Sequence, residues 1–293
     1  MSAIAAPASI RAVRASPSPL RQFARRLLRT RLALVGGGIV GVVTLGAILA
    51  AVAAPYSPTQ QDIRNLLRPP SPGHLLGTDE LGRDTLSRVL FGAQVSLEVG
   101  VIAVGISLVL GSGLGLLAGY ARGLTDAVIM RLMDGLLALP TLVLALALVA
   151  MLGPSLNNAM LAIGLTGVPI FARLVRGQVL SLRELDYIQA ARALGASSQR
   201  VMLEHVLPNV AAPIVVQASL AMPAAILAEA GLSFLGLGVQ PPTPSWGAML
   251  NTAKGYLQQD PWLAVAPGTA IFLTVLGFNF LGDAVRDALD PRL

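Results

Sequence analysis

The sequence predicts an all-α integral membrane protein with about six transmembrane helices. Of its 293 residues, 54% are hydrophobic and only 12% are charged, and the mean hydropathy is +0.70, whereas soluble domains have about 25% charged residues. Several uncharged runs reach the roughly 20 residues that a helix needs to cross a bilayer. Lys and Arg gather near alternate ends of these runs, which is typical of a polytopic protein with a fixed orientation.

The N-terminal region predicts a basic tail followed by a first transmembrane helix. Residues 1–31 contain seven arginines, no acid and no apolar period, so we expect a cytoplasmic, partly disordered tail. The first uncharged run lies between Arg31 and Asp62. A cleavable secretion signal is the alternative interpretation, because "AAVAAP" resembles a cleavage site. The apolar run over residues 32–54 is about 23 residues long, beyond the ~7–15 of a signal core, and favours an uncleaved helix.

Further uncharged runs predict the other five spans. The run between Asp134 and Arg173 is too long for one crossing and is divided by Gly153, Pro154, Asn157 and Asn158. Residues 230–253 are interrupted by "GVQPPTPSWG", so we expect a loop or re-entrant turn there. We place the second to sixth spans at 98–122, 134–153, 158–173, about 209–228 and about 262–282.

The basic residues predict that both termini lie in the cytoplasm, because Lys and Arg near span ends are retained on that side. With six spans, most of the 21 Lys and Arg residues fall on the side of the N-terminal tail. Those that fall on the other side are Arg64, Arg68, Arg83, Arg88 and Lys254. The predicted topology is N-in and C-in.

Glycines at intervals of four predict close helix packing in two spans. Gly111, Gly115 and Gly119 form two overlapping G-x-x-x-G patterns, and Gly37 and Gly41 form another. This spacing lets a neighbouring backbone approach closely. We favour packing within the chain over a subunit interface.

The segment "DYIQAARALGASSQRVMLEHVLP" (residues 186–208) predicts two short cytoplasmic helices between spans four and five. Ser181 and Glu184 match the S-x-x-E capping box of a helix start, and Gly195 would end this first helix. One face would carry an apolar stripe with two small residues at its centre, made of Tyr187, Ala190, Ala191 and Leu194. A protein groove and the membrane surface are equally good partners for this stripe.

The second short helix would begin at Ser197 or Ser198, whose hydroxyl can cap it. It would carry Val201, Met202 and His205. Pro208 would mark the return of the chain to the membrane.

The same segment resembles the signature loop of bacterial ABC importer permeases, which has a Glu-Ala-Ala triplet, a following glycine and a Leu-Pro pair. This chain has Gln189-Ala190-Ala191, then Gly195, then Leu207-Pro208. Gln189 replaces the usual Glu, which removes a charge at the expected contact but keeps hydrogen-bonding capacity. Three further stretches resemble the dipeptide, oligopeptide and nickel branch of these permeases, C-type subunit: residues 74–100, 228–250 and 281–293.

The resemblance implies that residues 32–293 form one permease domain in a bacterial inner membrane. Its partners would be membrane lipids, a homologous second permease, one or two ATPase subunits, and a periplasmic or lipid-anchored solute-binding protein. ATP and Mg would be held by the ATPases, and this chain would bind no cofactor itself. The resemblance assigns the ATPase contact to Tyr187, Gln189, Ala190, Ala191, Arg192, Gly195, Leu207 and Pro208.

The outer connection between spans one and two carries "GTDELGRD", residues 77–84. Local ion pairs and helix caps account for its balanced charges. The resemblance implies a second role, as part of an outer gate or a contact for the binding protein. The residues concerned are Gly77, Asp79, Gly82, Arg83 and Asp84.

Composition disfavours other classes of function. The chain has no Cys and two distant His residues, His74 and His205, so we expect no metal site. Its only lysine, Lys254, is not in a P-loop, and its arginines lie at span ends instead of forming a nucleic-acid surface. An ion-gradient-driven secondary transporter is the alternative. Its carboxylates would be Glu98 and Glu229, but both lie near the outer ends of spans and within reach of water or arginines, so we favour structural pairing for them. Asp283, near the inner end of the last span, would pair with Arg286 or a helix end.

Overall fold

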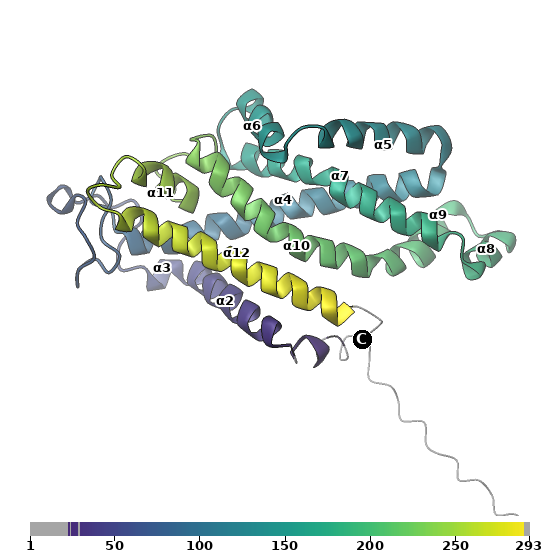
Figure 1. Cartoon of the computed structure of the whole chain (residues 1–293), viewed down its shortest axis with the longest axis horizontal. Coiled ribbons are helices and arrows are strands. Elements are labelled where there is room, and N and C mark those ends of the chain that lie inside the picture. The colour runs from purple at the N-terminus through teal and green to yellow at the C-terminus, as the bar shows by residue number, and fades with distance from the viewer. Residues whose placement is uncertain (1–22, 24, 29, 290–293) are drawn as a thin grey trace, which may run out of the picture.

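The computed structural model describes residues 23, 25–28 and 30–289. The predicted tail, residues 1–31, therefore lies mostly outside the described residues. Figure 1 shows an elongated bundle in which the long helices run along one another. The long helices of this bundle are α2 (Arg31–Ile48), α4 (Thr85–Ala121), α7 (Leu156–Leu182), α10 (Leu207–Phe234) and α12 (Trp262–Leu289).

A bent pair of helices supplies the remaining crossing. The axes of α5 (Gly123–Leu137) and α6 (Thr141–Leu152) meet at 93°. Within the described residues, five helices are long and apolar enough to cross a membrane, or six if this pair counts as one span. The prediction of about six spans is confirmed. The third span, however, begins at Gly123 and is kinked beside Pro140, which cannot continue a straight helix.

Several helices extend past the charged residues that were expected to end them. α4 begins 13 residues before Glu98, α5 includes Arg131, and α7 includes Arg173 and Arg176. The division between the third and fourth spans is confirmed. There Ser155 caps α7 by accepting a hydrogen bond from the Asn158 N–H at 3.1 Å.

The short elements lie at the two ends of the bundle. At one end are α3 (Ala50–Ala53), the outer loop (residues 54–84) with its 3₁₀ turn Ile63–Asn65, and α11 (Trp246–Ala253). At the other are α8 (Asp186–Ala193) and α9 (Ser198–Arg200), and the start of α2 and the end of α12 point toward this end (Figure 1). The loop expected over 230–253 is thus shorter, because α10 continues to Phe234 and α11 begins at Trp246. Which end faces the cytoplasm stays a prediction.

Glycines set the closest helix contacts. Gly111, Gly115 and Gly119 of α4 lie directly against α7, so their predicted role in packing within the chain is confirmed. Packing within the chain is wrong for Gly37 and Gly41, since a methyl group added at either position would meet no atom beyond its own helix backbone within 4 Å. Gly36 is the glycine of α2 that lies against α12, beside Gly277.

Candidate functional site

The segment 186–208 begins with an exposed helix, α8. Its predicted capping box is wrong: Ser181 is still inside α7 and its hydroxyl donates to the Gly177 carbonyl at 3.3 Å. Glu184 instead accepts a hydrogen bond from the Arg122 guanidinium at 2.6 Å. The sequence motif failed because α7 continues to Leu182 before the chain turns.

Gly195 ends α8 as predicted. Its φ is +86°, the left-handed conformation that a side chain disfavours. The Gly195 N–H donates to the Arg192 carbonyl at 2.9 Å and the Ala196 N–H to the Ala191 carbonyl at 3.1 Å, which together form a Schellman motif. Ser197 then caps the next turn by accepting from the Arg200 N–H at 3.3 Å, as predicted.

The second short helix is not a separate element. From Ser198 the chain continues through a π-helical turn, Val201–Val206, directly into α10, giving one helix to Phe234. Pro208 therefore lies inside a continuous helix, and its predicted place at the return of the chain to the membrane stays a prediction. A proline ring displaces the carbonyl four residues before it, and the wider π turn accommodates this displacement.

The predicted stripe on α8 faces away from the bundle. Ile188 is fully buried and holds the helix in place, whereas Tyr187 is 46% exposed and Leu194 is 88% exposed. Gln189 and Ala190 are also exposed, and Gln189 donates to the Glu184 carbonyl at 3.1 Å. An amphipathic helix with its apolar stripe outward is suited to lie in the groove of another protein.

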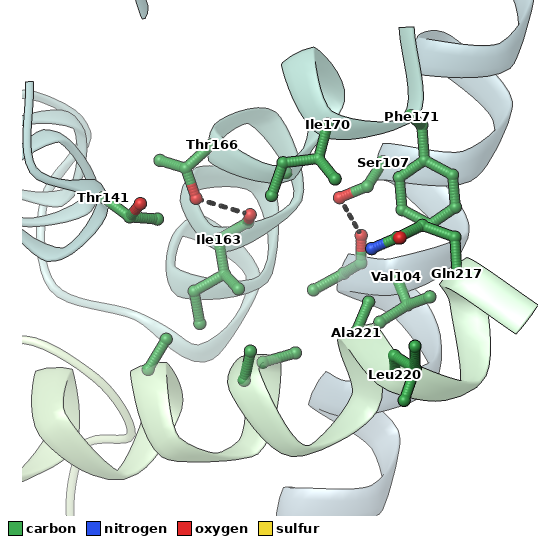
Figure 2. Close-up of a pocket in the computed structure, with 15 residues that line it drawn as sticks. Val104, Ser107, Thr141, Ile163, Thr166, Ile170, Phe171, Gln217, Leu220 and Ala221 are labelled. Atoms are coloured by element: carbon green, nitrogen blue, oxygen red, sulfur yellow. Dashed lines mark hydrogen bonds between the residues drawn. The ribbon is translucent and has the colours of Figure 1, made fainter. Parts of the chain in front are cut away.

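A cavity of about 160 Å³ lies between α4, α7 and α10. Figure 2 shows side chains from these three helices directed toward it. The Ser107 hydroxyl donates to the Gly164 carbonyl at 2.6 Å and the Thr166 hydroxyl to the Ile163 carbonyl at 2.8 Å, so both polar groups are already engaged. This cavity was not predicted from the sequence. A detectable signal was the alanine stripe on α10, at Ala221, Ala224, Ala225 and Ala228.

A second hollow, of about 650 Å³, lies farther along α10 toward the end that bears α8. Leu174, Asn209 and Arg286 are part of its lining. Gln217 and Leu220 line both hollows. These two residues therefore lie between the central cavity and the hollow nearer α8.

The outer loop is organised around Asp79. Its carboxylate accepts from the backbone N–H groups of Leu81 and Arg83, each at 2.9 Å, and from the Arg83 Nε at 2.7 Å. Arg83 also pairs with Glu80 at 2.9 Å, and Arg88 lies 3.4 Å from Asp79. Burial raises the pKa of Glu80 above its usual value, and the neighbouring Asp79 charge adds to this. The expected local ion pairs are present.

Asp84 joins this loop to α4. Its carboxylate caps the helix by accepting from the Ser87 N–H at 2.8 Å, and it lies 2.9 Å from Nδ1 of His74. Gly77 and Gly82 have positive φ, and a side chain on Gly82 would collide with the Asp62 carbonyl. The loop is thus a preformed surface, and in the described residues no cluster of His, Cys, Asp and Glu is suited to a metal ion.

Glu98 and Glu229, the two carboxylates considered for ion coupling, form no hydrogen bond with each other in the described part of the chain. Glu229 is fully buried near the outer end of α10, and its partners are the hydroxyls of Ser233 at 2.7 Å and Ser96 at 3.4 Å. The expected pairing with an arginine is therefore wrong for Glu229. Glu98 and Asp283 are exposed, and neither forms an ion pair with another described residue. Of the two partners expected for Asp283, Arg286 is therefore wrong, and an exposed pair of this kind would contribute little stability.

Comparison with known proteins identifies the family. Residues 111–293 match the model described as "Binding-protein-dependent transport system inner membrane component", and residues 18–70 match "N-terminal TM domain of oligopeptide transport permease C". The chain belongs to this family of transport permeases. The secondary-transporter alternative finds no support in these matches.

Curated relatives share nearly the whole length. The dipeptide transport system permease protein DppC of Alkalihalophilus pseudofirmus is 47% identical over 276 residues, covering 94% of this chain and 91% of the relative. The glutathione transport system permease protein GsiD of Pectobacterium atrosepticum is 45% identical over 277 residues, covering 94% and 92%. Among solved structures, the inward-facing MetNI methionine ABC transporter matches 69% of this permease and 96% of its own chain, with a TM-score of 0.57 and 18% identity. That match supports the fold.

Proposed function

We propose that this permease is the C-type membrane subunit of an ATP-driven importer of peptides or related small solutes in a bacterial inner membrane. Two curated relatives are named for dipeptides and for glutathione, which are both short peptides. The working complex would contain a homologous second permease, one or two ATPase subunits and a solute-binding protein. ATP and Mg would be bound by the ATPases, so this chain acts only as a conduit and a transmission element.

The observation that carries the proposal is the placement of α8. It projects from one end of the bundle with its apolar stripe exposed, and after Gly195 the chain passes without interruption into α10, a wall of the central cavity. A partner that grips α8 can therefore move a cavity wall. Alternating access follows if ATP binding and hydrolysis displace α8 in opposite directions.

The orientation follows from the same assignment. α8 and the arginines around it would face the cytoplasm, in agreement with the retention of basic residues on that side. The outer loop would then face the binding protein. Gly77, Asp79, Gly82, Arg83 and Asp84 would hold it as a rigid contact surface or outer gate.

A matched pair of glycine substitutions tests the transmission role. Gly195→Val and Gly153→Val both place a β-branched residue at a positive φ, +86° and +92°, and at both sites an added methyl would meet no other atom within 4 Å. Gly153 combines its φ with a ψ of 153°, a region that is essentially restricted to glycine, so the strain there is at least as large as the roughly 1–2 kcal/mol expected at Gly195 and makes Gly153→Val a stringent control. Only Gly195 lies between α8 and α10.

The assay is uptake and ATP hydrolysis by the tagged complex purified in mild detergent and reconstituted with its binding protein. Gly195→Val should insert and copurify with the ATPase but transport fewer molecules per ATP, whereas Gly153→Val should keep the ratio of the parent protein. An unchanged ratio in Gly195→Val would refute the transmission role. Transport by the chain without an ATPase, driven by an ion gradient, would overturn the proposed function.

A further inference from the structure

The inner end of α4 is contacted by the residues that lead into and form α8. Arg183 donates to the carbonyls of Gly119 and Tyr120 at 3.1 and 3.2 Å. Arg192, in the last turn of α8, places its guanidinium carbon 4.8 Å from the centre of the Tyr120 ring. α8 is therefore attached to α4 near both of its ends.

The ring of Tyr120 is the main partner of Arg192. Nε and Nη2 of Arg192 are buried and have no hydrogen-bond partner among the described residues. A planar guanidinium stacks well on an aromatic face and interacts favourably with it. Because no carboxylate or carbonyl within the described part of the chain holds these two nitrogens, the position of the side chain depends on the ring.

Other positive charges lie close to the contact between Arg192 and Tyr120. Burial and the nearby Arg122 and Arg192 lower the pKa of Arg183, so the cations in this region repel one another. The ring face offers Arg192 an attractive site that adds no further charge. The Tyr120 ring thus gives Arg192 a favourable contact beside two other arginines, Arg122 and Arg183, of which Arg122 is paired with Glu184.

The contacts of α8 with α4 and α10 determine which walls of the cavity move when α8 moves. At its C-terminal end α8 continues through Gly195 into α10, which contributes Ala221 to the cavity. The opposite wall includes Val104 of α4 (Figure 2), and the glycine stripe of α4 packs it against α7. Apart from the stack, α8 is held to the bundle by the Arg183 hydrogen bonds just before it begins and by the buried Ile188 in its first turn. The Arg192–Tyr120 contact adds an attachment to α4 in the last turn of α8.

We propose that the stacking of Arg192 on Tyr120 is a positioning contact that makes the α4–α7 wall of the cavity move together with α8. This inference rests on the proposed function. Arg192 and Tyr120 touch neither solute nor nucleotide in this role; they act by transmitting the displacement of α8. Without the stack, the last turn of α8 would still displace α10 but would no longer be attached to α4, whose remaining bonds, with Arg183, lie before α8 begins.

The test uses the natural absence of cysteine in the chain. Val104→Cys reports on the α4 wall and Ala221→Cys on the α10 wall, by their rates of modification with N-ethylmaleimide in the assembled complex. Rates are compared between the nucleotide-free state and the state trapped with ATP and vanadate. Each reporter is combined with Tyr120→Leu, which removes the ring, or with Tyr120→Phe, which keeps it.

We expect Tyr120→Leu to abolish the nucleotide dependence at Val104→Cys and to retain it at Ala221→Cys. Tyr120→Phe should retain both. Nucleotide dependence at Val104→Cys that survives in Tyr120→Leu would overturn the inference, and so would its loss in Tyr120→Phe. If the leucine variant assembles poorly, Tyr120→Met fills more of the vacated volume and tests the same loss of the ring.

Failure of the proposed function would give a different result from failure of this inference. In that case the modification rates of both reporter cysteines would be insensitive to nucleotide even with Tyr120 intact. Copurification of the ATPase with each variant shows that a changed rate reflects altered transmission within an assembled complex.

Discussion

The packing of α4 on α7 makes a quantitative prediction for Gly115. A Cβ at this position would lie 2.5 Å from the Ala172 carbonyl oxygen, 2.9 Å from Cβ of Val175 and 3.1 Å from Cα of Ala172. Carbon atoms at optimal separation are about 3.5–4.0 Å apart. Two of the three contacts involve backbone, so Gly115→Ala must push the helices apart. Overpacking of this kind costs about 1–3 kcal/mol.

Gly113 provides the control on the same helix. A Cβ there would meet no atom within 4 Å, so Gly113→Ala brings only the gain in helix propensity, about 0.5–1 kcal/mol. The same gain partly offsets the strain at Gly115. We therefore expect Gly115→Ala to lower the free energy of unfolding by about 1–2 kcal/mol and Gly113→Ala to leave it unchanged or raise it.

Thermal unfolding in detergent, followed by the fluorescence of size-exclusion peaks, measures the difference. At about 2–4 °C per kcal/mol for chains of 150–250 residues, Gly115→Ala should lower the midpoint by several degrees. Gly113→Ala should leave the midpoint unchanged or raise it. Equal midpoints for the two variants would refute the assignment of Gly115 to a tight contact between α4 and α7.

Three further predictions concern charged groups. Burial raises the pKa of Glu80 in the folded protein, so the carboxyl of the unfolded chain ionises first as pH increases through 4.5. The contribution of Glu80 to stability is therefore present at lower pH and is lost as pH rises through the folded pKa. Glu80→Gln should flatten this part of the curve of melting midpoint against pH. Glu229→Leu should lower the free energy of unfolding by about 1–3 kcal/mol for each hydroxyl left unpaired, including that of Ser233. Glu229→Gln keeps a hydrogen-bond acceptor and should unfold close to the parent midpoint. Asp126 and Arg176 form a bidentate pair at 2.5 and 2.6 Å, so Asp126→Arg and Arg176→Asp should each lower the melting midpoint. The double exchange should recover part of the loss, and additive losses would contradict the pairing.

Local signals in the sequence were sufficient for some elements. Gly195 and Ser197 predicted the end of one helix and the cap of the next, because these motifs depend on the geometry of a single turn. The spacing of Gly111, Gly115 and Gly119 predicted a packed face, because residues at intervals of four share one side of a helix.

Other features depend on contacts between distant residues and could not be predicted. Uncharged runs locate the membrane but not the helix ends, so the charge pattern places Arg173 and Arg176 in a connection although they lie within α7. The serines that surround Glu229 come from α4 and α10, and only the folded chain brings them together. The capping box at Ser181 had the correct residues, but tertiary packing kept that turn inside the preceding helix.

The prolines of α10 connect its two hollows to alternating access. Pro213 and Pro223 both lie inside the helix, and each removes a backbone hydrogen bond, so the helix can bend at these points at low cost. Gln217 and Leu220 lie between the prolines and line both hollows. A bend at either proline would displace these shared residues relative to both hollows. If α8 is the contact for an ATPase, as we propose, the direct continuity of α10 with the turn after α8 makes α10 the wall through which that partner would change both hollows at once.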